Sequence, residues 1–226
     1  MDIASQQGYQ GEARREDQTT AKVIATGTLA EGIAGAGAMV LAILGLVGIL
    51  PLLMLYVATI AVGAALLFEG GAVSGRVATM LGSENRSRAE LAEIGTGMSA
   101  EFLAGVAGVV LGVLALLGIA PITLVSIAAI VYGGALVLGS SATARINSLT
   151  FNRYEGSTAR AAAQEAIVAA SGVQILVGIG AIVLGIMSLI GILPLTLLLV
   201  SMLMLGFADI LSGGAIGGRV LSIFRG

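Results

Sequence analysis

The sequence predicts an all-α integral membrane protein with six transmembrane helices, arranged as three repeated helical hairpins. Two observations carry this prediction. Hydrophobic residues make up 57% of the chain and charged residues 11%, whereas a soluble domain carries about 25% charge. A short apolar turn pattern of Gly and Pro also occurs three times, each time between two long apolar stretches. The 34 glycines follow no collagen period and are typical of closely packed transmembrane helices.

The repeated unit is centred on a proline. The stretch LGLVGILPLL (44–53) returns as LALLGIAPITL (114–124) and MSLIGILPLTL (187–197). Alignment on the prolines also aligns glycines three and sixteen residues before the proline and twelve residues after it. The aligned sets are Pro51, Pro121 and Pro194; Gly48, Gly118 and Gly191; Gly35, Gly105 and Gly178; and Gly63, Gly133 and Gly206.

Each proline is flanked by two apolar stretches of about 20 residues, which at 1.5 Å per residue span a bilayer core of about 30 Å. Each turn is then a tight connection at the membrane edge, where Gly ends one helix and Pro begins the next. The chain divides into a polar N-terminal segment at 1–28, hairpin repeats at 29–72, 99–142 and 172–216, linkers at 73–98 and 143–171, and a tail at 217–226.

The charged residues predict an orientation. All eleven Lys and Arg residues lie away from the prolines, so the positive-inside rule places both termini and the linkers in the cytoplasm. Residues 1–22 lack the apolar region of a signal peptide, so we expect the first span to direct insertion. The segments 86–94 and 158–170 are good helix formers that either extend the following spans or form separate surface helices.

Small residues recur at 3-4-3 spacing in the first helix of each hairpin, beginning at Gly35, Gly105 and Gly178. Such stripes let helix backbones approach closely in a membrane. Gly63, Gly133 and Gly206 begin a shorter stripe in each second helix. Three equal hairpins with matching stripes suggest a pseudo-threefold bundle, although a linear array would use the same stripes.

A second set of aligned positions carries polar residues. Glu31, Glu101 and Gln174 each lie twenty residues before a proline. One interpretation is a ring of two carboxylates and an amide that binds cations or passes protons. The alternative is that these groups lie at the cytoplasmic boundary, where a Glu in the first turn complements the helix dipole.

Asp209 lies fifteen residues after Pro194, about 8 Å inside the core, and is a candidate functional residue. Gly178 is level with it, so we expect the backbone there to come close. The alternative is a structural hydrogen bond from Asp209 to Gln174 or Ser212. Glu69 lies nearer the interface and is a weaker candidate.

The residue inventory excludes several functions. The chain has no Cys and no His, which removes disulfides, imidazole bases and almost every transition-metal site. No nucleophile–base pair is present, so we expect no enzyme, no metal and no cofactor. With no Lys/Arg cluster, we also expect no nucleic-acid partner.

The repeat resembles that of the HdeD-type bacterial membrane proteins, a family of short hairpin repeats. The best copy reads GIGAIVLGIMSLIGILPLTLLLVSMLMLGFADILSGG (178–214). The chain departs from the family in its higher glycine content, its lack of aromatic residues at span ends and its longer polar N-terminus. The resemblance implies a multi-pass protein of the bacterial inner membrane, associated with acid or general stress. No catalytic or ligand residue carries over.

Three functions remain open. The first is a non-enzymatic HdeD-type protein linked to acid or envelope stress. The second is a structural or accessory subunit that forms a homo-oligomer or packs on a larger complex, so that its partners are the bilayer and itself or another membrane protein. The third is a small proton or cation channel or transporter that uses Glu31, Glu101 and Asp209.

The orientation is testable with reporters fused after Gly226. We expect a reporter that works only in the cytoplasm to be active when it is fused at this position, because the positive charges favour a cytoplasmic C-terminus. Activity of a reporter that works only outside the cytoplasm would reverse the predicted orientation.

Overall fold

The computed structural model describes residues 29–81, 88–151 and 158–223, and within these ranges the chain forms six helices and no strand. The predicted N-terminal segment 1–28 and the eleven Lys and Arg side chains that set the predicted orientation lie outside the part whose side chains are described. The helices are Leu29–Leu46, α2 (Pro51–Leu81), α3 (Arg88–Leu116), α4 (Pro121–Phe151), α5 (Thr158–Leu189) and α6 (Pro194–Ile223).

Five helices in the described ranges are long and apolar enough to cross a membrane, which fits a multi-pass membrane protein. The apolar part of α3 is shorter and covers Ala100–Leu116, whereas the sequence predicts a span at 99–119. The five long windows are Leu29–Leu46, Pro51–Gly70, Pro121–Ser140, Gly172–Leu189 and Pro194–Gly213.

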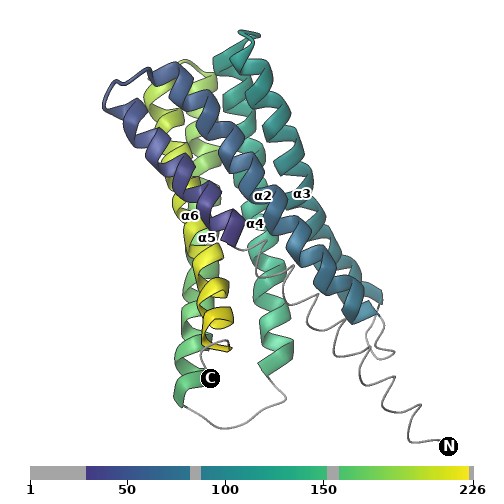
Figure 1. Ribbon diagram of the computed structural model, residues 1–226. Coiled ribbons are helices and arrows are strands. Elements are labelled where there is room, and N and C mark those ends of the chain that lie inside the picture. Colours follow the sequence, from purple (N-terminus) through teal and green to yellow (C-terminus); the bar gives the residue numbers. More distant parts are fainter. Residues whose placement is uncertain (1–28, 82–87, 152–157, 224–226) are drawn as a thin grey trace, which may run out of the picture.

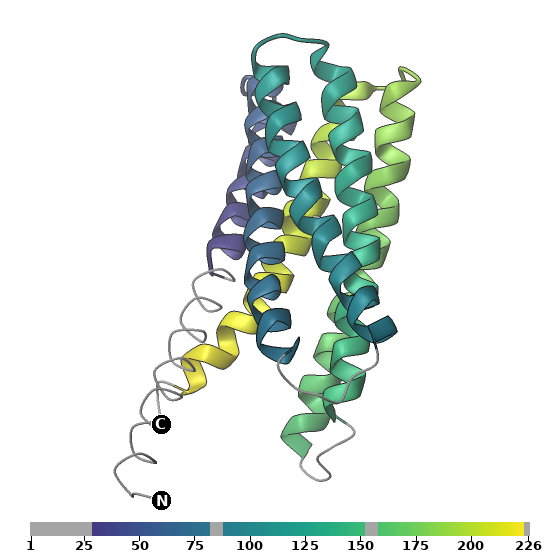
Figure 2. The ribbon, with the colours of Figure 1, turned by 90° about the vertical axis from the view of Figure 1, so that its right-hand side faces the viewer.

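The helices extend beyond these windows at the end away from the prolines. α3 begins at Arg88 and α5 at Thr158, so of the two alternatives for the linker segments, the structure has helices that continue into the following spans. α2 and α4 contain 31 residues each and are about 46 Å long. The short turns therefore lie at one end of an elongated bundle, and long helical extensions lie at the other (Figures 1 and 2).

The three turns that precede the prolines share one backbone conformation. Gly48 has φ +95°, and its N–H donates to the carbonyl of Gly45 while that of Ile49 donates to Leu44. This pair of bonds is the Schellman motif that ends a helix. Leu50 follows with φ +41°, and the next helix begins at Pro51. The other turns repeat these features with Gly118 and Gly191 at positive φ, Ala120 and Leu193 in the left-handed region, and Pro121 and Pro194 at the helix starts.

Glycines bring three pairs of helices into backbone contact. A Cβ added to Gly35 would lie 2.8 Å from the carbonyl oxygen of Gly206, so the Leu29–Leu46 helix crosses α6 there. A Cβ on Gly105 would lie 2.7 Å from the carbonyl oxygen of Gly63, where α3 crosses α2. The third crossing joins α5 to α4, through Gly178 and Gly133. At these crossings no side chain larger than hydrogen fits.

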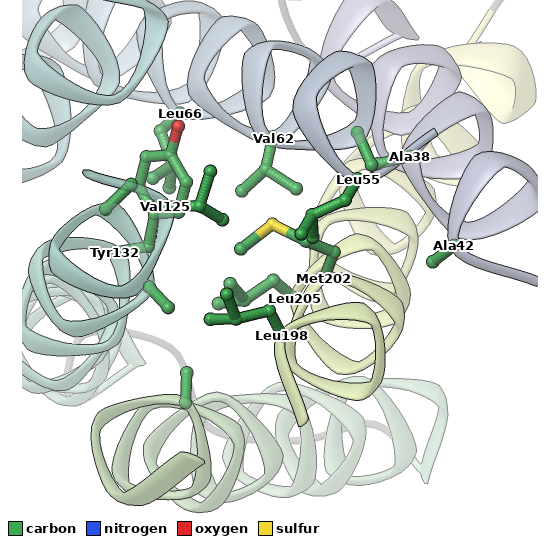
Figure 3. Close-up of a cluster of buried hydrophobic side chains, with 14 of the residues drawn as sticks. Ala38, Ala42, Leu55, Val62, Leu66, Val125, Tyr132, Leu198, Met202 and Leu205 are labelled. Atoms are coloured by element: carbon green, nitrogen blue, oxygen red, sulfur yellow. The ribbon is translucent and has the colours of Figure 1, made fainter. Parts of the chain in front are cut away.

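The three helices that begin at a proline, α2, α4 and α6, also contact one another. Their apolar side chains fill the interior of the bundle (Figure 3). Tyr132 is the largest fully buried side chain, and its hydroxyl donates to the carbonyl of Thr59 at 2.7 Å. Its ring lies against Gly108, where any side chain would collide with it. The labelled members of this core are Ala38, Ala42, Leu55, Val62, Leu66, Val125, Tyr132, Leu198, Met202 and Leu205.

The crossing between α4 and α5 makes a prediction about stability. We expect Gly133→Ala to lower the free energy of unfolding by about 1–3 kcal/mol, because the added methyl overlaps the Gly178 backbone. The matched control is Gly134→Ala, since nothing lies within 4 Å of a Cβ there. Unfolding in mixed detergent micelles measures both variants. Equal stability of the two would contradict the close crossing.

Candidate functional site

Polar side chains from five helices gather at the end of the apolar windows that lies away from the turns. We call these six residues the polar layer. Glu31 comes from the Leu29–Leu46 helix, and α4 contributes none of the six. The layer consists of Glu31, Glu69 of α2, Glu101 of α3, Gln174 of α5, and Asp209 and Ser212 of α6.

Most of the polar layer is buried. Glu31 and Asp209 are each 1% exposed, and Glu101 is 5% exposed. Glu69 and Ser212 are partly exposed, but Oε2 of Glu69 is itself buried and has no hydrogen-bond partner in the described part of the chain. Buried polar groups in a membrane protein are costly and mark candidate functional sites.

One hydrogen bond joins two helices within the layer. The Ser212 hydroxyl of α6 donates to Oε1 of Glu69 of α2 at 2.9 Å. Gln174 lies near the Glu69 carboxyl group, and Ser212 also lies near Glu31. Glu69, a weaker candidate by its position in the sequence, therefore lies at the centre of these contacts.

Four carboxyl groups of the layer are electrostatic neighbours. Those of Glu69, Asp209 and Glu101 lie close enough to Glu31 for their charges to interact with it. Glu101 in turn interacts with Glu69 and Asp209. Buried carboxylates that lie close together are strongly unfavourable unless protons, cations or cationic side chains offset their charges. The eleven Lys and Arg residues lie outside the part of the chain whose side chains are described.

Asp209 has the least compensated carboxyl group. Neither of its oxygens has a hydrogen-bond partner in the described part of the chain, which excludes the structural bond to Gln174 or Ser212 considered from the sequence. Its backbone neighbour is also different from the expected one. A Cβ on Gly35 would lie 2.6 Å from that of Asp209, whereas Gly178 packs on Gly133. The spacing along one helix gives a residue's level but not which neighbouring helix it faces.

Glu101 occupies space left by a missing side chain. Its carboxyl group lies directly over Gly139 of α4, where an added Cβ would collide with Oε1. Glu101 lies thirteen residues after the start of α3 and Gln174 sixteen after the start of α5. Neither is in a first turn, so the helix-dipole interpretation is wrong for Glu101. The segments ahead of these two spans are themselves helical, so the helix starts lie farther along the chain toward the N-terminus.

Within the described ranges, no group of three or more acidic, His or Cys side chains is arranged so that it could hold a metal ion. Ser212 was considered in the sequence only as a neighbour of Asp209. Its position eighteen residues after Pro194 aligns with Glu69 after Pro51, and this shared offset is the signal that would have paired the two.

Comparison of the chain with protein-family models, with curated proteins and with solved structures found no match. The polar layer is therefore interpreted from its own geometry.

Replacement of Asp209 by Leu tests whether this carboxyl group has a structural role. We expect Asp209→Leu to raise the free energy of unfolding by about 1–3 kcal/mol, because an unsatisfied buried polar group is removed. Thermal unfolding in detergent at neutral pH measures the change. The matched control is Leu66→Asp, which we expect to destabilise. A loss of stability in Asp209→Leu would mean that the acid makes a contact the fold requires.

Proposed function

We propose that this chain is a non-enzymatic, multi-pass membrane protein that binds and passes protons through its polar layer. The observation that carries the proposal is the gathering of four neighbouring carboxyl groups, two of them on residues that are 1% exposed. Carboxyl chains of this kind line proton relays in membrane proteins.

Protons are favoured over metal cations by the geometry of the layer. A metal ion requires several oxygen ligands around one point, and the described carboxyl groups do not converge in that way. A proton requires only one carboxyl oxygen and a neighbouring acceptor. The contact between Ser212 and Glu69 supplies such a pair.

The proposed architecture is a ring of three hairpin repeats about a pseudo-threefold axis. Each glycine crossing joins the second helix of one hairpin to the first helix of the next, and the Gly206–Gly35 crossing joins the third hairpin back to the first. This last contact supports a closed ring over a linear array. The mutual contacts of α2, α4 and α6 support an axis that runs between them.

The cellular role that we propose is proton handling at the bacterial inner membrane, with both termini in the cytoplasm. The HdeD-type resemblance, with its link to acid stress, supports this role because acid stress is a proton load. The positive charges of the linkers and termini support the orientation.

Proton flux into proteoliposomes tests the proposal. We expect the wild-type protein to dissipate a pH gradient, and Glu31→Gln, Glu101→Gln and Asp209→Asn to reduce the flux to near that of protein-free vesicles. Each change keeps the side chain's shape and removes its exchangeable acid. Ser126→Ala is the control, because Ser126 bonds to Ser188 away from the polar layer. Wild-type flux in all three variants would exclude the proposal.

A further inference from the structure

Asp209 occupies a position that the fold fills with leucine elsewhere. Fifteen residues after the other two prolines stand Leu66 and Leu136. Both are buried, at 0% and 1% exposed, and Asp209 is equally buried at 1%. The packing at this level is therefore satisfied by an apolar side chain. Packing does not explain an acid here, and burial makes an acid costly.

The described surroundings of Asp209 contain several titratable groups. The titratable groups that interact with it are Glu69 of α2, Glu31 of the Leu29–Leu46 helix, Glu101 of α3 and Tyr132 of α4. α5 contributes only the amide of Gln174 to this level. Both Asp209 oxygens lack a partner, so the carboxyl group can exchange a proton without breaking a structural bond.

Polar side chains continue along α6 from Asp209 toward the end away from the turns. Ser212 lies one helical turn farther along α6 and donates to Glu69. Both of these residues are partly exposed, whereas Asp209 is buried. Hydroxyl and carboxyl groups at this spacing are the elements from which proton relays are built.

The opposite direction is closed by apolar side chains. Leu55, Val125 and Leu198 each lie four residues after a proline and are 0% exposed. Met202 and Leu205 lie between Leu198 and Asp209 along α6, and both belong to the same apolar core (Figure 3). A buried hydroxyl, that of Ser201, lies within this region without a hydrogen-bond partner.

We infer that Asp209 is the innermost proton-binding residue of the polar layer, reached through Glu69 and Ser212 and closed off from the turns by Leu55, Val125 and Leu198. This inference rests on the proposed function, because it assigns the proton to one residue and the access to one direction. The inferred site occurs at one crossing, that of the Leu29–Leu46 helix with α6. The positions that align with Asp209 at the other two crossings hold Leu66 and Leu136.

Infrared difference spectroscopy of the reconstituted protein tests the assignment to Asp209. We expect a protonated-carboxyl band that changes with pH in the wild type and is lost in both Asp209→Asn and Asp209→Leu. Asp209→Leu is expected to fold normally, because Leu66 and Leu136 fill the aligned positions. Loss of the band in this variant would therefore not be caused by misfolding. An unchanged band in both variants would overturn the assignment. A band that is displaced by Na⁺ at constant pH would show a metal-cation site and would also overturn it.

Single cysteines test the direction of access, and the natural chain has no Cys to interfere. We expect a water-soluble thiol reagent to label Ser212→Cys in vesicles and to leave Ser201→Cys unlabelled, although both are small changes on the same helix. Equal labelling of the two would show that the apolar layer does not close the bundle. Both variants unfolded in denaturant serve as the positive control for labelling.

Failure of this inference is distinguishable from failure of the proposed function. Wild-type proton flux that persists in Asp209→Asn but falls in Glu31→Gln would keep the proposed function and remove Asp209 as the binding residue. An absence of flux in the wild type would remove proton passage, while the infrared band would still report whether Asp209 binds a proton.

Discussion

The close approach of helix backbones at the three glycine crossings is the contact on which the rest of the structure depends. Lipid supplies little hydrophobic force between helices, so van der Waals contact at short range must hold them. The Gly35–Gly206 crossing also brings the backbone of the first helix against Asp209, and the missing side chain of Gly139 makes room for Glu101. The glycines therefore both join the helices and create the space in which the acids lie.

At two interior positions, Tyr132 and Asp209, the residue differs in size or polarity from the residues that align with it in the other two repeats. Tyr132 aligns with Val62 and Leu205, and the glycine that faces it, Gly108, aligns with alanines. The larger ring and the smaller neighbour compensate each other in volume. Asp209 has no such compensation, since it replaces a leucine and gains no partner. The first departure is explained by packing, and the second is the one that calls for a function.

The sequence predicts where the helices begin better than it predicts which helices pack against one another. Gly and Pro have strong local effects on the backbone, so the helix starts at Pro51, Pro121 and Pro194 follow directly from the residue types. Which helix faces Asp209 depends on tertiary packing, and the expected Gly178 is replaced by Gly35. The distance of Glu101 from its helix start could not be predicted, because the segment before it could form either a separate surface helix or an extension of the span.

The turns have a consequence for how the protein meets its surroundings. Their backbone N–H groups are largely bonded within the Schellman motif, and Pro has no N–H to satisfy. Each turn is a connection of four residues with apolar or no side chains. The first connection lies between Leu46 and Pro51. A protease needs an extended segment of several residues in its active site, so digestion from that side would leave all three connections intact.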